Sequence, residues 1–213
     1  MRLVLLSIAG AVAAVVPAHA QSYGGGQSGP RPLLPRNEEI ALARSAAPVA
    51  LSDSATIFVL TAGGYEVAVQ GTTGAACYVS RDWLESLEPH CFDAEGAVTV
   101  LPIHMRRVEL LHQGKTREDA DRAIADGLLA GRFRLPTRPV VSYMLSAAQR
   151  LKSAAGQSAS QWKPHVMIYY PYWTSVGAAG PDVIMVDAGK PIASLVVVVP
   201  EFVQPGVVPT SGR

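Results

Sequence analysis

The stretch TIFVLTAGGYEVAVQGTTGAACYVS, residues 56–80, decides the fold class of this chain. Its first six residues are mostly apolar or β-branched, which is typical of a buried strand. The dipeptide Gly63-Gly64 that follows favours a hairpin turn. The next six residues alternate, and the side chains predicted to face the core are Tyr65, Val67 and Val69. After a second turn, GTTG, residues 75–80 return as a third strand, so the stretch predicts an antiparallel meander.

Helix signals lie on both sides of this meander. Asn37 is a good N-cap for a short helix that Pro48 ends. Pro102 favours the first turn of a longer helix, where its missing N–H is least costly. Thr116 predicts the cap of a second helix, which ends at Gly131. The two longer helices therefore form a predicted hairpin that covers one face of the sheet.

Strand signals resume after this hairpin, whereas residues 81–97 are predicted to be irregular. The later strand signals lie at residues 140–146, 165–170, 183–186 and 195–199. The shortest of them is residues 183–186. Together these patterns predict a single α+β domain over residues 37–200. Its sheet is expected to be antiparallel, with about five to six strands.

The two ends of the chain have different compositions from this domain. Residues 1–20 combine an early arginine, an apolar run and a terminal Ala-His-Ala, the pattern of a signal peptide. The apolar run is too short for a membrane span, so none is expected after the signal is removed. Residues 21–36 predict a flexible Gly/Pro/Ser-rich leader, and residues 201–213 predict a flexible tail. The sequence thus predicts an exported protein, either periplasmic or extracellular.

The charge balance excludes some classes of partner. The formal charge of the chain is +1, and removal of Arg2 with the signal peptide brings it to zero. A protein that binds nucleic acid or an anionic membrane usually has a basic stripe, and the sequence has only short arginine clusters. We therefore expect no nucleic-acid partner.

Cys77 and Cys91 are the only cysteines. In an oxidising compartment an even number of cysteines favours a disulfide, so we predict that these two residues are bonded. The alternative, a thiol nucleophile beside His90 or His165, lacks any of the flanking patterns of cysteine enzymes.

Aromatic residues are concentrated in the segment WKPHVMIYYPYW, residues 162–173. One interpretation is that a strand of this kind packs into the core, with the later rings bracing loops. The other interpretation is an aromatic-rimmed groove that binds a sugar, a peptide or a hydrophobic small molecule. The candidate ligand-binding residues of that groove are His165, Tyr169, Tyr170, Tyr172 and Trp173.

The sequence lacks the motifs of serine hydrolases, of phosphate-binding loops and of metal sites. There is no Gly-x-Ser-x-Gly, no phosphate-binding loop and no His-x-x-x-His or Cys-x-x-Cys pair. We therefore assign no catalytic residue, no metal ligand and no cofactor. In place of a metal site, the default expectation is that His90, His104, His112 and His165 are solvated surface residues.

Three stretches resemble an uncharacterised family of exported bacterial proteins. They are EEIALARSAAP at residues 38–48, GTTGAAC at residues 71–77 and the segment from Pro164 to Tyr172. The resemblance implies export and a single domain over roughly residues 37 to 200. It implies no reaction and no ligand.

These patterns favour a non-enzymatic envelope or secreted domain that binds a small ligand or an envelope protein. The alternative is a hydrolase-like enzyme with an aromatic groove around His165. The ligand, the oligomeric state and the order of the loop at residues 147–163 stay open at this point.

Overall fold

A computed structural model describes residues 28–83, 85–151, 160–177, 180 and 182–199 of the chain. The predicted signal peptide, the leader up to residue 27 and the tail from residue 201 lie outside these residues. So do residues 152–159 of the long loop that precedes Lys163.

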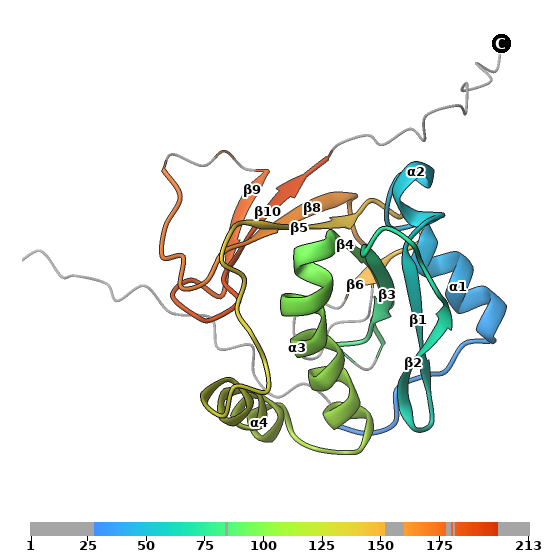
Figure 1. Ribbon diagram of the computed structural model, residues 1–213, viewed down its shortest axis with the longest axis horizontal. Helices are drawn as coiled ribbons and strands as arrows, with labels where there is room; N and C mark the ends of the chain where they lie inside the picture. The colour runs from blue at the N-terminus through green and yellow to red at the C-terminus, as the bar shows by residue number, and fades with distance from the viewer. Residues whose placement is uncertain (1–27, 84, 152–159, 178–179, 181, 200–213) are drawn as a thin grey trace, which may run out of the picture.

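The described chain has four helices and ten strands (Figure 1). The helices are α1 (Arg36–Arg44), α2 (Val49–Ser52), α3 (Ala94–His112) and α4 (Arg117–Leu129). The first five strands are β1 (Thr56–Thr61), β2 (Gly64–Val69), β3 (Ala76–Ser80), β4 (Glu88–Phe92) and β5 (Val140–Met144). The last five are β6 (Arg150–Leu151), β7 (Ser160–Gln161), β8 (His165–Tyr169), β9 (Val183–Val186) and β10 (Ser194–Val198).

Eight of the strands form one sheet in the order β2-β1-β3-β4-β5-β8-β10-β9, while β6 and β7 pair separately. The α+β class is confirmed, but the expected five to six strands are too few. Neighbouring strands are antiparallel except β1 and β3, which run parallel. The four later strand signals are confirmed as β5, β8, β9 and β10.

The predicted meander is wrong in one respect, because β3 pairs with β1 and not with β2. The GTTG turn runs back beside the start of β1, where Thr72 N donates to Ser54 O at 2.9 Å. A Cβ on Gly71 would lie 2.2 Å from the backbone nitrogen of Thr56, so only glycine permits this approach. Thr56 N then donates to Ala75 O at 2.9 Å, which starts the parallel pair.

The inward orientation of three side chains in β2 is confirmed only in part. Tyr65 and Val69 are half-buried, whereas Val67 is 46% exposed. The pairing of β1 with β2 shifts register between Ile57 and Phe58. A shift of this kind interrupts the alternation of faces, which sequence periodicity assumes to be continuous.

Residues 81–97 are not irregular, as the sequence suggested. They contain β4, which lies between β3 and β5, and the first turn of α3. That helix begins at Ala94 and not at Pro102, because the Asp93 side chain accepts a hydrogen bond from Gly96 N at 2.7 Å and caps it. Pro102 lies inside the helix.

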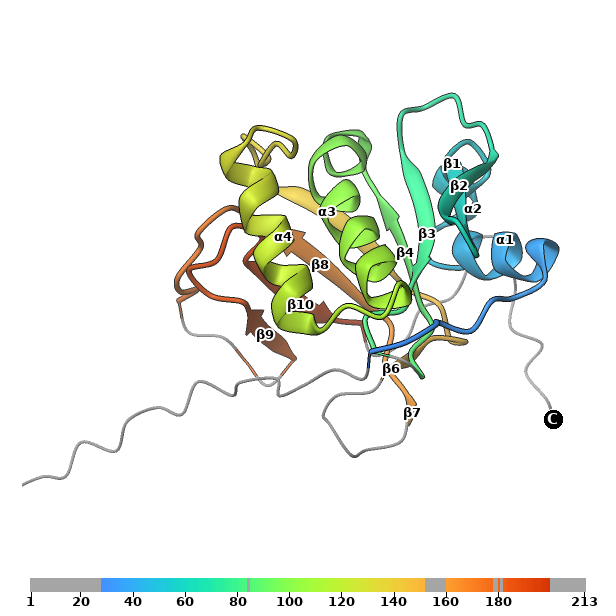
Figure 2. The ribbon, with the colours of Figure 1, turned by 90° about the horizontal axis from the view of Figure 1, so that it is seen from below.

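The expected helical hairpin is present. The Thr116 side chain caps α4 by accepting a hydrogen bond from Asp119 N at 3.1 Å, and Gly131 follows the helix with φ 68°. Figure 2 shows α3 and α4 side by side. Of the two helices, α3 packs on the central strands and α4 packs on α3.

Hydrophobic clusters cover both faces of the sheet. Phe92 and Tyr78 pack with Leu101 and Ile103 of α3, and Cys77 and Val79 pack with Ala43 of α1. Because side chains alternate along a strand, β3 and β4 present one set to α3 and the other to α1. Both faces of the central strands are therefore buried.

Candidate functional site

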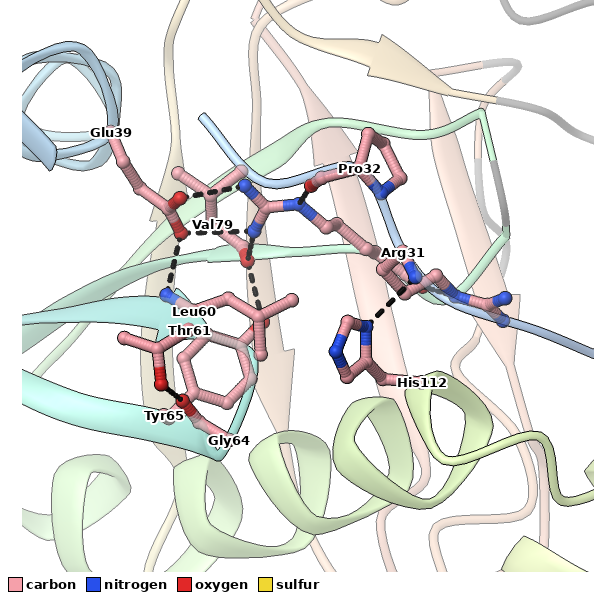
Figure 3. Close-up of polar contacts among 10 residues, drawn as sticks. Arg31, Pro32, Glu39, Leu60, Thr61, Gly64, Tyr65, Val79 and His112 are labelled. Atoms are coloured by element: carbon pink, nitrogen blue, oxygen red, sulfur yellow. Dashed lines mark hydrogen bonds and ion pairs between the residues drawn. The ribbon is translucent and has the colours of Figure 1, made fainter. Parts of the chain in front are cut away.

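The end of the predicted leader is packed against the domain. Arg31 is 2% exposed, its Nε donates to Arg81 O at 2.8 Å, and its backbone N donates to His112 Nδ1 at 2.8 Å. Figure 3 shows Arg31 beside His112 of α3. Arg31, which lies in the predicted leader, is therefore packed against the domain, whereas most of the other residues of 28–36 are exposed.

A buried ion pair connects this segment to the sheet. The Arg81 guanidinium donates to both Glu39 carboxylate oxygens, at 3.0 and 2.8 Å, and its Nε donates to Pro32 O at 2.9 Å. Glu39 also accepts a hydrogen bond from Leu60 N at 2.9 Å (Figure 3). Because Arg81 joins α1, β1 and the N-terminal segment, the chain just after β3 has a defined position.

Next to this ion pair, polar side chains converge between α3 and the sheet. We call them the polar cluster; its members are Tyr78, Asp82, Glu88, His90, His104 and Arg117. Tyr78 and His90 face each other across β3 and β4, with ring centroids 5.4 Å apart. His104 of α3 lies over them, 6.0 Å from the His90 ring. Glu88 begins β4, whereas Asp82 follows β3 and Arg117 begins α4.

The unusual property of the polar cluster is its unpaired atoms. Among the described residues, six buried side-chain nitrogen or oxygen atoms have no hydrogen-bond partner, and five of them belong to the cluster. These five atoms are Tyr78 Oη, Asp82 Oδ1, Glu88 Oε1, His104 Nε2 and Arg117 Nε. A buried polar atom without a partner costs about 1–3 kcal/mol, and most proteins pair nearly all of them. The concentration of five such atoms among six neighbouring residues is unusual, and it makes the polar cluster the candidate site.

Burial also changes the acid–base properties of the cluster. It raises the pKa of Glu88 to about 8, an effect that the nearby Asp82 charge reinforces. It lowers the pKa of His104 to about 4, helped by the positive charge of Arg107, and lowers that of His90 well below its ordinary value. At pH 7 Glu88 is therefore mostly protonated and both imidazoles are neutral.

Asp82 behaves in the opposite way from Glu88. Burial opposes its ionisation, but the positive charges of Arg107 and Arg117 together lower its pKa. Arg117 Nη1 lies 3.6 Å from Asp82 Oδ2, and the Arg117 guanidinium stacks 4.9 Å above the Trp83 ring. The Asp82 side chain is 25% exposed and that of Arg117 14%, so the polar cluster reaches solvent at this ion pair.

The candidate ligand-binding residues from the sequence do not all lie together. Tyr169 is 1% exposed and packs edge-on against His104, with ring centroids 5.7 Å apart, so it borders the polar cluster. His165 is 3% exposed and its Nδ1 donates to Lys163 O at 2.9 Å. Tyr170 and Tyr172 are 44% and 57% exposed, and Trp173 is half-buried against Tyr170.

The exposed aromatic residues are hydrogen-bonded to the turn at residues 187–190. Trp173 O accepts a hydrogen bond from Gly189 N at 2.7 Å, and Tyr172 N donates to Lys190 O at 2.9 Å. These bonds hold the aromatic segment against the turn that contains Asp187. The negative charge of Asp187 acts on both His104 and Arg107.

Cys77 and Cys91 form the predicted disulfide. They are register partners in β3 and β4, and both are completely buried. They lie on the α1 face of the sheet, opposite the polar cluster. Since these are the only cysteines of the chain, no free thiol is present to act as a nucleophile.

The sequence interpretation missed this site because it treated the histidines as solvated. His90 and His165 are each 3% exposed, and His104 and His112 are half-buried, so none of the four is a fully solvated surface residue. The available signal was the composition of β4, in which Glu88 and His90 share a strand face with Phe92. Within the described ranges, no group of three or more His, Cys, Asp or Glu side chains could hold a metal ion.

No family model, no curated protein and no solved structure matches this chain. Within the part of the chain that the structure describes, no helix has the length and apolar character needed to cross a membrane.

Proposed function

We propose that this protein is an exported domain that binds a small molecule at the polar cluster. The observation that carries the proposal is the group of five buried, unpaired polar atoms. A protein that only had to be stable would pair these atoms or replace them with apolar groups, because leaving them unpaired reduces stability. Binding sites accept that loss because the ligand supplies the missing hydrogen bonds.

Export is the second part of the proposal. It is supported by the signal-like pattern of residues 1–20 and by a disulfide, which persists in oxidising compartments. The resemblance to exported bacterial proteins is consistent with the same compartment. Expression of the full chain in a bacterial host tests it: mass spectrometry should find a mature product that begins at Gln21 outside the cytoplasm. A full-length product that stays in the cytoplasm would contradict export.

A ligand-observed NMR screen with small polar fragments tests the binding site. We expect fragments to bind the wild-type protein and to lose binding in His104→Phe. The matched control is Arg44→Lys, because within the described ranges Arg44 Nε is the one unpaired buried side-chain atom outside the cluster. The proposed site would be overturned if fragments bound the wild type, His104→Phe and Arg44→Lys equally. It would also be overturned if no fragment bound the wild type.

An enzyme is the second candidate, and one observation favours it. Glu88, with a pKa raised to about 8, and Asp82, with a lowered pKa, are the kind of carboxyl pair that serves as acid and base in hydrolases. In this candidate the reacting groups belong to the polar cluster and not to a groove around His165. Hydrolysis of chromogenic glycosides or esters that Glu88→Gln abolishes would favour the enzyme over the binding domain.

A further inference from the structure

We infer that the ligand of the polar cluster is an uncharged compound with several hydroxyl groups, which is the chemistry of a saccharide. This inference rests on the proposed binding function and specifies its ligand class. It follows from two properties of the cluster: the mixture of donors and acceptors left unpaired, and the pairing of its charges.

The unpaired atoms need a ligand that both donates and accepts hydrogen bonds. Asp82 Oδ1 can only accept and Arg117 Nε can only donate, whereas Tyr78 Oη and His104 Nε2 can do either. A phosphate or carboxylate has only acceptors to offer Asp82, and an ammonium has only donors to offer Arg117. Hydroxyl groups satisfy every member of this set, because each hydroxyl is both a donor and an acceptor.

The charges around the cluster are already paired within the protein. Arg117 has Asp82 at 3.6 Å, Arg107 has Asp121 at 3.1 Å, and Lys190 has Asp187 at 2.7 Å. A charged ligand would therefore find each of these side chains already paired with an opposite charge of the protein.

The remaining titratable groups add no free charge. The Arg31 guanidinium donates to the main-chain oxygens of Gly29, Arg81 and Asp82. Glu88, His90 and His104 are mostly neutral at pH 7. A charged ligand would therefore lose its hydration without gaining an unpaired counter-charge, which is unfavourable.

A series of sugars that differ in charge tests this inference by isothermal titration calorimetry at pH 6.5. Glucose and N-acetylglucosamine are the neutral probes, glucuronate is the anion and glucosamine is the cation. We expect a neutral sugar to bind, and both charged sugars to bind at least about tenfold more weakly because of uncompensated desolvation. A comparison of glucose with maltotriose distinguishes a free sugar from a glycan chain, since a chain-binding site favours the trisaccharide.

Conservative variants connect the binding to the cluster. Tyr78→Phe and Glu88→Gln should each weaken neutral-sugar binding by about tenfold, because each loses or alters one hydrogen bond. Arg44→Lys, outside the cluster, should leave the affinity unchanged. Circular dichroism of each variant confirms that the fold is retained.

The outcomes separate the ligand class from the binding site. If glucuronate or glucosamine binds more tightly than the neutral sugars and the cluster variants weaken it, the site stands and the saccharide inference fails. If no sugar binds but polar fragments still bind in a His104-dependent way, the saccharide inference again fails and the binding function stands. If neither sugars nor fragments bind at the cluster, both fail.

Discussion

The guanidinium of Arg81 and the carboxylate of Glu39 form an ion pair in which neither side chain is exposed to solvent. Arg81 directs its remaining hydrogen bonds to the main-chain oxygens of Pro32 and Val79. The pair therefore holds together the N-terminal segment, α1 and the end of β3. The residue that follows Arg81 in the chain, Asp82, is a member of the polar cluster.

The variant Glu39→Gln should be strongly destabilised. It leaves the Arg81 charge buried without a partner, which typically lowers the free energy of unfolding by about 3–5 kcal/mol. Urea unfolding followed by circular dichroism measures the change. Glu66→Gln is the control, because the Arg36–Glu66 pair is half-exposed and should contribute less than about 1 kcal/mol. Equal losses in the two variants would contradict the structural role of the buried pair.

Tyr78→Phe should stabilise the free protein by about 1 kcal/mol, because it removes a buried hydroxyl that has no partner. Tyr65→Phe is the matched control, since the two rings lie 5.5 Å apart and Tyr65 Oη donates to Val79 O at 2.6 Å. The Tyr65 variant should therefore lose about 1 kcal/mol. Thermal unfolding of both variants measures the difference. Destabilisation of Tyr78→Phe to the same extent would show that its hydroxyl is paired.

The stability of the protein should fall as the pH rises from about 6.5 to about 8. Folding raises the pKa of Glu88 from its ordinary value of 4.5 to about 8, so the folded state binds this proton more tightly than the unfolded state. That contribution is complete below pH 4.5 and is lost as the pH rises through 8. The buried histidines oppose this effect only at the acidic end of the window, because their folded pKa values are lowered and the unfolded imidazole loses its proton near its ordinary value of 6.5. The midpoints of urea unfolding at pH 6.5, 7.25 and 8 measure this loss of stability. The variant Glu88→Gln should lose less stability over the same pH range. If its stability falls as steeply as that of the wild type, other groups cause the pH dependence.

The disulfide gives a prediction about thiols and stability. The purified protein, denatured without reductant, should show no thiol that reacts with Ellman's reagent. The double variant Cys77→Ala/Cys91→Ala should be less stable by about 3 kcal/mol, as the bond closes a loop with a sequence separation of 14. Detection of two thiols would contradict the bonded state.

Local patterns were sufficient for much of the fold. The strands β5, β8, β9 and β10 follow from β-branched and apolar runs, and the Thr116 cap follows from a hydroxyl before an acidic first turn. The pattern failed at β4, whose sequence EPHCF contains a charge, a proline and a histidine. This strand is buried between β3 and β5, so its environment overrides its weak intrinsic preference.

The candidate site was less accessible to sequence reasoning. Tyr169 was selected as an aromatic strand residue and does border the polar cluster, although it was not grouped with His104. The cluster itself draws residues from β3, β4, α3, α4 and the connection after β3. No spacing along the chain brings these residues together, since their proximity depends on strand order and helix placement.

The sequence by itself determined most of the strands, the helical hairpin with the Thr116 cap of α4, and the identity of the disulfide partners. These features depend on hydrogen bonds and side-chain preferences within a few residues, or on there being only two cysteines. The tertiary structure alone decided that β3 pairs in parallel with β1, that β4 lies between β3 and β5, and that the His104 ring lies between those of His90 and Tyr169. Those relationships depend on close approach between distant segments, such as Gly71 against Thr56, and on burial, which determines whether a histidine or carboxyl carries charge.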